Sequence, residues 1–419
     1  MNANAPRAPL KTLDDALVAL LAHANTLEGT QTVSLFEADG RVLAQDITSG
    51  LQVPPNDNSS MDGYAVRCAD VPQAGVVLQV TQRIPAGSTG TAMTPGSAAR
   101  IFTGAPIPPG ADAVVMQEDC EPVGEDGVRV NTVPPSGQWI RRAGEDVTRG
   151  AVVLQKGERL SPASLGLAAS IGLDQIVVAA RPRVALFSTG DELVMPGTVA
   201  PHDMKPGAIY NSNRFFLRAL LQRLGCEVTD LGIVPDQRHA TLDALRAAAG
   251  QHDLILTSGG VSVGEEDHIK PAVEALGQLD LWQIAIKPGK PFAYGHIDAQ
   301  LGGKADKTHF MGLPGNPVSS FITFLLLVRP FLLKLQGVSR VATHSIAVPA
   351  HFTWARADKR REFLRVRRNA AGGLGLFPNQ SSGVLTSAVW GDGVVDNPPG
   401  RTIAQGDVVQ FIPFAGWLS

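Results

Sequence analysis

The sequence is short of cysteine and of excess charge of either sign. Its 419 residues include three cysteines, Cys68, Cys120 and Cys226, which are far apart in the chain. Three dispersed thiols build neither a disulfide framework nor a cysteine-rich metal cage, so they indicate a reducing compartment. The 36 basic and 39 acidic residues give a formal net charge of −3. That balance provides no basic surface for nucleic acid or an anionic membrane, and neither partner is predicted.

Targeting and membrane segments are also lacking. The N-terminal stretch has no apolar core of a signal peptide, so a cytoplasmic location is predicted. The most apolar run, 321–333, contains Arg329 and Pro330 and is shorter than the roughly 20 residues that span a bilayer. We interpret it as a buried helix, in a core or at a subunit interface. The chain has no Walker A loop, no G-x-G-x-x-G turn and no HExxH pair, so any nucleotide or metal must be held in another way.

What the chain does contain is enough apolar sequence for several folded domains. Hydrophobic residues make up 44% of it and charged residues 18%, which argues against disorder. Residues 30–140 hold short β-like runs between turns rich in glycine and proline. From 181 to 336 strand and helix patterns alternate, which predicts an α/β layer with a parallel-rich sheet. Short strand patterns return after 339. The expected fold class is therefore multidomain, α/β plus β.

The loops that follow the strands of the α/β stretch carry most of its chemistry-bearing residues. In such sheets these loops gather at the carboxyl edge, where ligands bind. Their sequences are STGDEL at 188–193, VPD at 234–236, SGGVSVGEED at 258–267, KPGKP at 287–291 and LPGNP at 313–317. Each loop alone has a plain structural explanation, but together they predict a binding site.

Carboxylates and glycines on these loops predict a cation beside an oxyanion. Ser258, Gly259 and Gly260 can turn successive backbone N–H groups toward a phosphate or molybdate. Three of the loops also carry carboxylates: Asp191 and Glu192 on the first, Asp236 on the second, and Glu265, Glu266 and Asp267 on the third. Carboxylates repel a bare phosphate, so a bridging Mg²⁺ would explain the pairing. The alternative is a set of ordinary glycine turns followed by acidic helix starts.

Two lysines and several prolines complete this edge. Lys287 and Lys290 flank a stiff Pro–Gly pair in KPGKP, and two lysines held together attract an anion. The alternative is two solvated lysines on a turn. In LPGNP, Pro314 and Pro317 fix the shape of the loop, and Asn316 either caps the following helix or approaches a ligand.

Two further loops stand out in the β-rich stretch before residue 140. NSSMDGYAV, at 58–66, places Asp62 beside Gly63, and FTGAPIPPGAD, at 102–112, places Thr103 before a glycine. A hairpin turn at Asp62–Gly63 is the plain interpretation of the first loop. The residues alone favour that turn over a functional role.

Taken together, these strings resemble the molybdopterin molybdenumtransferase (MoeA) family, which includes the catalytic domain of gephyrin. The matching strings, in family order from about residue 10 to the C-terminus, are NSSMDGYAV, FTGAPIPPGADAVV, RRAGEDV, STGDEL, TSGGVSVGEEDHIK, IAIKPGKPFAYG, MGLPGNPVSSFITF, REFLRV and NQSSGVLTSA. Several are long and of unusual composition, so a chance match does not explain them.

The resemblance implies an elongated subunit of four parts. A first domain, for dimerisation, combines 1–50 with 140–180, and a β-rich second domain spans 51–139. A MogA-like α/β domain that binds molybdopterin spans 181–336, and a β-barrel-like C-terminal domain spans 340–419. The family forms homodimers in which the partner's second domain completes the active site, which would give Asp62 and Thr103 a function.

The resemblance also implies a reaction. The substrate would be molybdopterin already adenylated by a partner enzyme, molybdopterin adenylyltransferase. Magnesium-dependent cleavage of the phosphoanhydride would release AMP, and molybdate would be inserted at the dithiolene sulfurs to form molybdenum cofactor. Apo-molybdoenzymes would receive the product. No protein thiolate has to hold the molybdenum, which is compatible with the few cysteines.

The family's functional residues carry over motif by motif. Catalytic roles fall on Asp62, Thr103, Asp146, Glu192, Asp236, Asp267, Lys287 and Lys290, of which Glu192, Asp236 and Asp267 would hold magnesium. Substrate contacts fall on Ser258, Gly259, Gly260, Ser262, Gly264, Pro314, Pro317, Ser382, Arg361 and Arg365. The chain departs from the family at Gln283, where some members have a lysine, and at Gln237, where many have a carboxylate. An insertion-like stretch at 296–310 predicts a surface loop.

Two other functions fit parts of the pattern. The adenylyltransferase of the preceding step shares the α/β module, but its glycine loop typically reads TSGGTG where this chain reads TSGGVSVGEED. It also lacks the flanking domains. The second alternative is a non-catalytic scaffold, by analogy with gephyrin. The acidic and basic loop residues favour catalysis over scaffolding.

Overall fold

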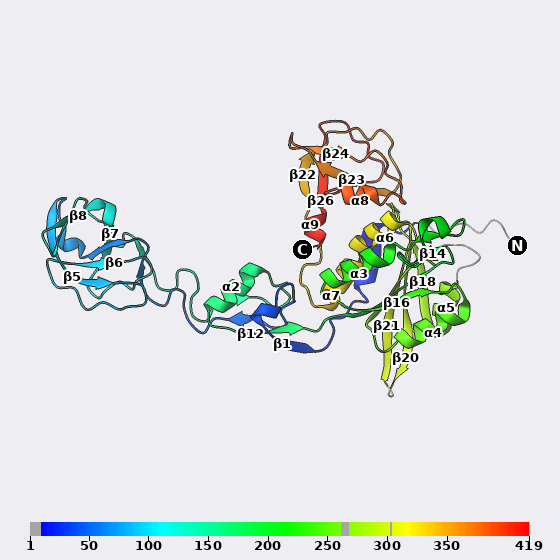
Figure 1. Ribbon diagram of the computed structural model, residues 1–419, viewed down its shortest axis with the longest axis horizontal. Helices are drawn as coiled ribbons and strands as arrows, with labels where there is room; N and C mark the ends of the chain where they lie inside the picture. The colour runs from blue at the N-terminus through cyan, green and yellow to red at the C-terminus, as the bar shows by residue number, and fades with distance from the viewer. Residues whose placement is uncertain (1–9, 261–267, 302–303, 419) are drawn as a thin grey trace.

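The computed structural model describes residues 10–260, 268–301 and 304–418. Figure 1 shows an elongated molecule with a small β lobe at one end (residues 62–130, the distal lobe). A middle part containing α2 (Pro162–Ser170) connects it to a body of helices and strands at the other end (residues 183–335, the α/β body). The C-terminal domain, from residue 340, lies against this body.

The α/β body contains a six-stranded mixed sheet. In sheet order its strands are β16 (Glu227–Val234), β13 (Arg183–Thr189), β17 (Leu254–Ser258), β21 (Lys304–Leu313), β20 (Pro291–Leu301) and β18 (Gly277–Gln283). The first four run parallel, and β20 is antiparallel to both of its neighbours. Strand β17 is buried along its length, as parallel strands covered on both faces are. The predicted parallel-rich α/β sheet is confirmed.

Helices cover both faces of this sheet. Successive side chains along each strand point to opposite faces, so the sheet has a separate hydrophobic core on each side. The core on one face includes Leu186 and Leu256 and packs on α3 (Asn213–Arg223). The other includes Phe187 and Ile255. Its helices are α4 (Arg238–Ala248) and α5 (Ile269–Leu276). The layers leave the strand ends open at the edge of the sheet, where the predicted loops lie.

The apolar run predicted as a buried helix belongs to one long helical segment. It consists of α6 (Pro317–Thr323), a π turn at Phe324–Val328 and α7 (Arg329–Leu335). By length and composition alone the segment could cross a membrane, but 89% of its apolar window is buried inside the protein. It is the core helix of the body and packs beside α1 (Leu13–Leu21), whose first turn is capped by Thr12.

Two predictions for the segment 284–310 are wrong. The strand expected before the KPGKP loop is reduced to β19 (Ile286–Lys287), which pairs with β23 (Arg361–Arg368) of the C-terminal domain and not with the α/β sheet. The stretch 296–310 is no surface loop, since its described residues lengthen β20 and β21 into a long antiparallel hairpin. The second strand of that hairpin leads directly into the LPGNP loop.

The distal lobe is a β-sheet with a core on each face. In sheet order its strands are β7 (Ala113–Met116), β4 (Gly63–Val66), β6 (Ser97–Ile101), β5 (Val76–Ile84), β9 (Gly127–Val130) and β8 (Cys120–Val123). Val66 and Val115 contribute to one core, and their neighbours Ala65 and Val114 to the other. The predicted β-rich character of this stretch is confirmed.

Paired antiparallel strands connect the lobe to the rest of the chain. The pairs are β3 (Asn58–Ser59) with β10 (Ile140–Arg141), β2 (Ile47–Thr48) with β11 (Val152–Leu154), and β1 (Thr30–Ser34) with β12 (Gln175–Ala179). One core takes Leu43 and Ile47 from the outgoing segment and Leu154 and Ile176 from the returning one. The chain before and after the lobe therefore folds as one unit.

The C-terminal domain is a small β structure. Its strands are β23, β22 (Ile346–Pro349), β24 (Leu374–Leu376), β25 (Gly393–Asn397) and β26 (Val408–Pro413), and its helices are α8 (Thr386–Trp390) and α9 (Phe414–Leu418). The strand β19 of the α/β body adds to this sheet beside β23. A bridge between Ala350, which follows β22, and Leu374 in β24 joins the two sides of the sheet. The resulting ring surrounds Leu364, Val395 and Phe411, in agreement with a barrel-like arrangement.

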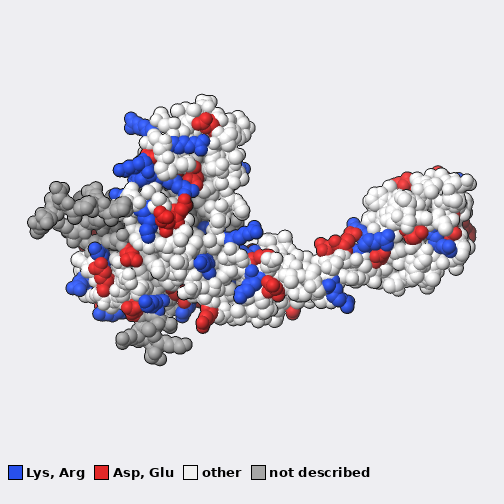
Figure 2. All heavy atoms as spheres, turned by 180° about the vertical axis from the view of Figure 1, so that it is seen from behind, with Lys and Arg blue, Asp and Glu red and all other residues white. Residues whose placement is uncertain are grey.

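Charged side chains are mixed over the surface. On the face seen in Figure 2, acidic and basic groups are interspersed over the body and the C-terminal domain, and most of the distal lobe is uncharged. No large area of this face carries one sign, as the balanced composition predicts.

Candidate functional site

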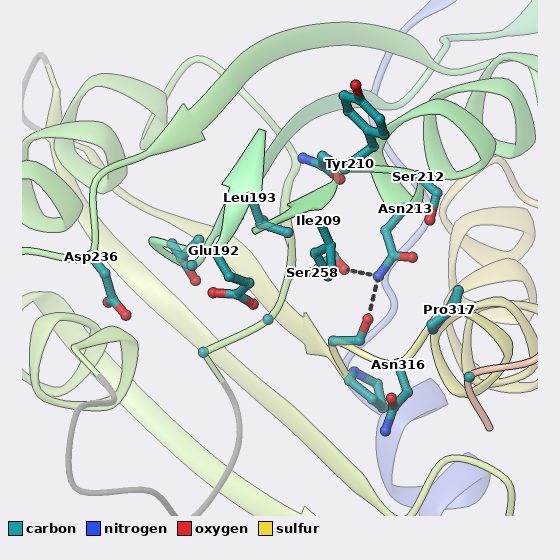
Figure 3. A pocket seen from close by; sticks show the side chains of 18 of the residues that line it. Glu192, Leu193, Ile209, Tyr210, Ser212, Asn213, Asp236, Ser258, Asn316 and Pro317 are labelled. Atoms are coloured by element: carbon teal, nitrogen blue, oxygen red, sulfur yellow. Dashed lines mark hydrogen bonds between the residues drawn. The ribbon is translucent and has the colours of Figure 1, made fainter. Parts of the chain in front are cut away.

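A pocket of about 700 Å³ opens at the carboxyl ends of β13, β17 and β21. Its wall contains the sequence-predicted residues Glu192, Asp236, Ser258, Gly259, Gly260, Pro314 and Pro317. Figure 3 shows the two carboxylates on one side and Asn213, Asn316 and Pro317 on the other, with Ser258 between them. Loops far apart in sequence meet here because parallel strands end at the same edge.

Two glycines bring the first two loops into contact. Gly259 and Gly260 have φ of 95° and 66°, a left-handed backbone that favours glycine. A side chain at Gly259 would meet the carbonyl oxygen of Thr189, and one at Gly260 would meet Ile269. The close approach lets the 258–260 backbone turn against the end of β13, and the Gly259 N–H donates to the Leu313 carbonyl at 3.0 Å.

Asn213 ties three loops of the pocket together. It is the first residue of α3, and its amide nitrogen donates to Ser258 Oγ and to the Gly315 carbonyl, at 2.7 Å each (Figure 3). The side chain is only 7% exposed, so it acts as an internal strut. The relative positions of the Ser258 and LPGNP loops therefore depend on one buried amide.

The carboxylates line the pocket on the side of β16 and β13. Glu192 folds over Gly190, where a Cβ would lie within 3 Å of its carboxylate. Asp236 follows β16, two residues beyond Val234. Among the residues that the structure describes, no group of three His, Cys, Asp or Glu side chains is placed to hold a metal ion. The third predicted metal ligand, Asp267, lies outside the described residues, as do Ser262 and Gly264.

The LPGNP loop shapes the opposite wall. Pro317 lies in the first turn of α6, and Asn316 occupies the N-cap position without a side-chain capping bond. The capping role suggested for Asn316 is therefore wrong, and its side chain lines the pocket. The backbone N–H of Val318 donates to the Ser382 carbonyl at 2.9 Å, which brings the loop of the C-terminal domain to the pocket rim, where Gly383 lies.

The two lysines of KPGKP differ in their surroundings. Lys287 Nζ lies 3.0 Å from Glu362 Oε1 and 3.4 Å from Asp358 Oδ2, so its charge is neutralised by the C-terminal domain. Lys290 is half-buried, and no described carboxylate pairs with it. The next residue, Pro291, lines the pocket. Lys290 is thus the better placed of the two to meet an anion.

The arginines predicted to contact an oxyanion serve other groups. Arg365 is 1% exposed and donates to Ser387 Oγ and to the carbonyls of Phe363 and Ser381. Arg361 binds both carboxylate oxygens of Asp396, at 2.7 and 2.6 Å, and also Asp14. Neither lines the pocket. Both assignments are therefore corrected: these residues hold the C-terminal domain together and attach it to α1.

Asp62 and Thr103 form a pair in the distal lobe. The Thr103 N–H and hydroxyl both donate to Asp62 Oδ1, at 2.8 Å each. These two hydrogen bonds lower the pKa of the exposed Asp62 carboxyl. The predicted hairpin turn is wrong, because Gly63 begins β4, which pairs with β6 and β7. A side chain at Gly63 would collide with the Val115 carbonyl, which explains the glycine.

The structure does not bring the remaining predicted residues to the same pocket. Asp62 and Thr103 lie in the distal lobe, at the far end of the molecule from the α/β body (Figure 1). Asp146 is exposed in the connection to the lobe, where its N–H donates to the Val53 carbonyl. Within one chain, these three residues and the pocket are separate sites.

Sequence reasoning missed one part of the pocket wall. The additional lining residues include Thr189, Tyr210, Asn211, Ser212 and Asn213. Asn211 is 2% exposed, and its amide nitrogen finds no acceptor among the described residues. The sequence signal for these residues is the polar string YNSN, at 210–213, before an amphipathic helix. That string predicts where the helix begins, but it gives no reason to assign a ligand-binding role.

Three family models match successive parts of the chain. "MoeA N-terminal region (domain I and II)" matches residues 11–172, "Probable molybdopterin binding domain" matches 185–334, and "MoeA C-terminal region (domain IV)" matches 347–414. Together they cover most of the sequence. The gap between the first two, from residue 173 to 184, falls at the boundary between the middle part and the α/β body.

Known proteins resemble the chain over most of its length. A molybdopterin molybdenumtransferase of Haemophilus influenzae is 46% identical over 328 residues, 78% of each chain. One from Nostoc is 35% identical over 344 residues, 80% of this chain and 77% of the relative. The crystal structure of a molybdopterin biosynthesis moeA protein from Pyrococcus horikoshii superposes with a TM-score of 0.83 at 29% identity, covering 97% of this chain and all of the other.

Proposed function

Since the chain belongs to the MoeA family of molybdopterin molybdenumtransferases and inserts molybdate into molybdopterin, we propose that it does so in the pocket of the α/β body. The observation that carries this proposal is the convergence of Glu192, Asp236, Ser258 and Pro314 on one pocket. A volume of about 700 Å³ is within the usual range for a cofactor-sized ligand.

The substrate we propose is adenylated molybdopterin, with Mg²⁺ required and AMP released. Cleavage of the phosphoanhydride by water gives AMP and molybdopterin, whose two dithiolene sulfurs then take up molybdenum as molybdate loses oxygen as water. Magnesium, when bound, would neutralise the phosphate charge and polarise the bond that breaks. Glu192 and Asp236 would hold it, since Mg²⁺ commonly uses one or two carboxylates together with substrate phosphates and water.

The chain's own groups would position the anions. Of the two glycines, Gly260 would offer its backbone N–H to a phosphate oxygen, because the Gly259 N–H already donates to the Leu313 carbonyl at 3.0 Å. Lys290 would add a positive charge at the rim, whereas Lys287 keeps the C-terminal domain in place through Glu362. Asn213 would fix the spacing between the Ser258 and LPGNP loops, so that both contact one ligand. Asp267 remains a proposed third magnesium ligand.

We further propose a homodimer in which the partner's distal lobe completes each pocket. Asp62 and Thr103 are exposed, are joined to each other, and lie far from the pocket of their own chain. A hydrogen-bonded carboxylate at the protein surface suits a group that acts on a ligand held by another subunit. Asp146, in the connection to the lobe, would contribute from the same side.

The division into domains follows the separate cores. We propose a first domain of 1–50 with 140–180, a second of 51–139, a third of 181–336 and a fourth of 340–419. The shared core of the middle part, the two cores of the lobe and the ring of the last domain support this division. A cytoplasmic location, delivery of substrate by molybdopterin adenylyltransferase and transfer of product to apo-molybdoenzymes complete the proposal, with no nucleic-acid or membrane partner.

The decisive experiment supplies adenylated molybdopterin, Mg²⁺ and molybdate to the purified protein. Release of AMP that depends on molybdate and Mg²⁺, together with activation of an apo-molybdoenzyme, is the expected result. Efficient adenylation of molybdopterin from ATP, without molybdate insertion, would contradict the assignment. Mixing two inactive variants, Asp62→Asn and Asp236→Asn, tests the shared site. Each heterodimer would have one intact composite pocket of two, so the turnover should return to about half of the wild-type value for pure heterodimer and to about a quarter for the whole mixture.

A further inference from the structure

Two arginines lie next to each other beside the Asp62–Thr103 pair. Arg83 in β5 and Arg100 in β6 are register partners on neighbouring strands. Their guanidinium carbons lie over the same ring, that of Phe102, at 4.6 and 4.5 Å from its centroid. Like charges on adjacent strands disfavour folding unless another group compensates them. An anion that binds to both would compensate these charges further than the Phe102 ring does.

Arg100 is built into the loop that carries Asp62. Its Nη1 donates to the Gly63 carbonyl at 2.8 Å, and its Nη2 donates to Gln117 Oε1 at 2.6 Å. The Gln117 backbone N–H donates in turn to the Asp62 carbonyl at 3.0 Å. Phe102 directly precedes Thr103, and the positive charge of Arg100 contributes to lowering the pKa of Asp62 after the two Thr103 hydrogen bonds, so the arginines lie near the Asp62–Thr103 pair.

Arg83 is free to bind a ligand. Its side chain is exposed and makes no hydrogen bond to any residue that the structure describes. No described carboxylate lies within 4.0 Å of a guanidinium nitrogen of either arginine. The Phe102 ring attracts both guanidinium groups and holds them in place. The two side chains therefore lose little conformational entropy when an anion binds to them.

We propose that Arg83 and Arg100 form an anion subsite of the distal lobe that binds the phosphate groups of the adenylated substrate held by the partner's pocket. The proposal rests on the proposed function, in which this lobe completes that pocket. Guanidinium groups bind phosphate oxygens through paired N–H donors. The two positive charges also offset the repulsion between the Asp62 carboxylate and an anionic substrate.

The test is a steady-state comparison of Arg83→Gln with the wild-type holoenzyme, varying each substrate in turn. We expect the KM for adenylated molybdopterin to rise about tenfold, as removal of one charge-assisted contact predicts, with kcat within about twofold. Competitive inhibition by inorganic pyrophosphate should weaken by a similar factor. Arg83→Lys should recover part of the affinity, which a merely structural role would not explain.

The control is Arg129→Gln, because Arg129 is an exposed arginine of the same lobe, in β9, paired with Glu121 at 3.2 Å. It should leave both KM values unchanged. A KM increase for molybdate, with none for the adenylated substrate, would overturn the assignment to phosphate. No change in either KM would overturn the subsite.

Asp62→Asn, assayed in parallel, separates the two levels of the argument. If Asp62→Asn is inactive and Arg83→Gln behaves like wild type, only the subsite fails. If Asp62→Asn retains full activity, Asp62 takes no part in the reaction, and the proposed composite site, in which the lobe completes the partner's pocket, fails.

Discussion

Glu362 and Lys287 join the C-terminal domain to the α/β body through an ion pair in which only the carboxylate is buried. The Glu362 side chain is 1% exposed, and Lys287 Nζ donates to its Oε1 at 3.0 Å. The Trp354 indole N–H donates to the other carboxylate oxygen at 2.8 Å. The same two residues are partners in the pairing of β19 with β23. Main chain and side chains therefore fix the domain boundary at one point, next to the pocket rim.

Neutralising Glu362 should weaken this connection. Glu362→Gln keeps an acceptor for Trp354 but leaves Lys287 without its closest carboxylate, so we expect a loss of about 1–2 kcal/mol. The loss is limited because the lysine side chain is 38% exposed and can be solvated. A double-mutant cycle with Lys287→Met in thermal unfolding measures the coupling. Glu121→Gln, at an exposed pair, is the control, and absence of coupling would contradict the role.

The two lysines of KPGKP should separate in function. Lys290→Met should raise the KM for molybdate about tenfold or more, because it removes a charge-assisted contact. Lys287→Met should lower the melting temperature more and the KM for molybdate less, because its partners are Glu362 and Asp358. Steady-state kinetics and thermal unfolding of both variants decide this. The reverse pattern would show that the surroundings of the two lysines had been misassigned.

Removing the Asn213 strut should damage both stability and substrate binding. Asn213→Ala leaves the Gly315 carbonyl and Ser258 Oγ without their 2.7 Å donor, a loss of about 1–3 kcal/mol. The KM for adenylated molybdopterin should rise, because the two loops lose their fixed spacing. Gln222→Ala is the matched control, since Gln222 is exposed on the same helix and does not line the pocket. Equal effects of the two substitutions would exclude the strut.

The charge of Asp62 should depend on Thr103. Thr103→Val removes the hydroxyl donor and keeps the backbone N–H donor, so the pKa of Asp62 should rise part of the way to its ordinary value. The acid limb of kcat/KM should move to higher pH if Asp62 acts as the anion. A carboxyl NMR titration measures the pKa directly, with Thr91→Val as a control in the same lobe. An unchanged pKa would show that the hydroxyl does not stabilise the carboxylate.

His309 should make the body sensitive to mild acid. Burial first, and then the charges of His23 and His296, lower its pKa from 6.5 to about 4. The unfolded chain binds a proton there below pH 6.5 and the folded chain does not, so stability falls as pH drops through this window. The loss should total about 3 kcal/mol, from 1.36 kcal/mol per pKa unit. Chemical unfolding of His309→Gln at pH 7 and pH 4 should lack this component, whereas exposed His344→Gln should retain it.

The sequence predicts the pocket residues well where their position depends on the end of a strand or the start of a helix. Ser258, Gly259 and Glu192 follow buried strands, and a parallel sheet places all strand ends on one edge. Pro317 at the start of α6 is likewise a local preference of the helix. These positions follow from patterns that are readable within a few residues.

The sequence fails where the deciding contact is distant. Arg365 looks like an exposed cation on a strand, but Ser381 and Ser387, 16 and 22 positions away, bury it. Asn213 becomes a strut only because Gly315 arrives from 102 positions away. The β20–β21 hairpin was missed because polar residues such as Asp298 and Lys307 lie on its exposed outer part, so no apolar alternation reveals a strand.

The paired strands at the root of the distal lobe have a consequence for the history of the chain. Entry and exit lie side by side, since β3 pairs with β10 and β2 with β11. A unit with adjacent ends and its own cores can be inserted into a surface turn of another unit without opening that unit's core. The distal lobe is thus one folded unit inserted into another. Its sequence can diverge, become shorter or be replaced as long as the distance between its two ends is kept.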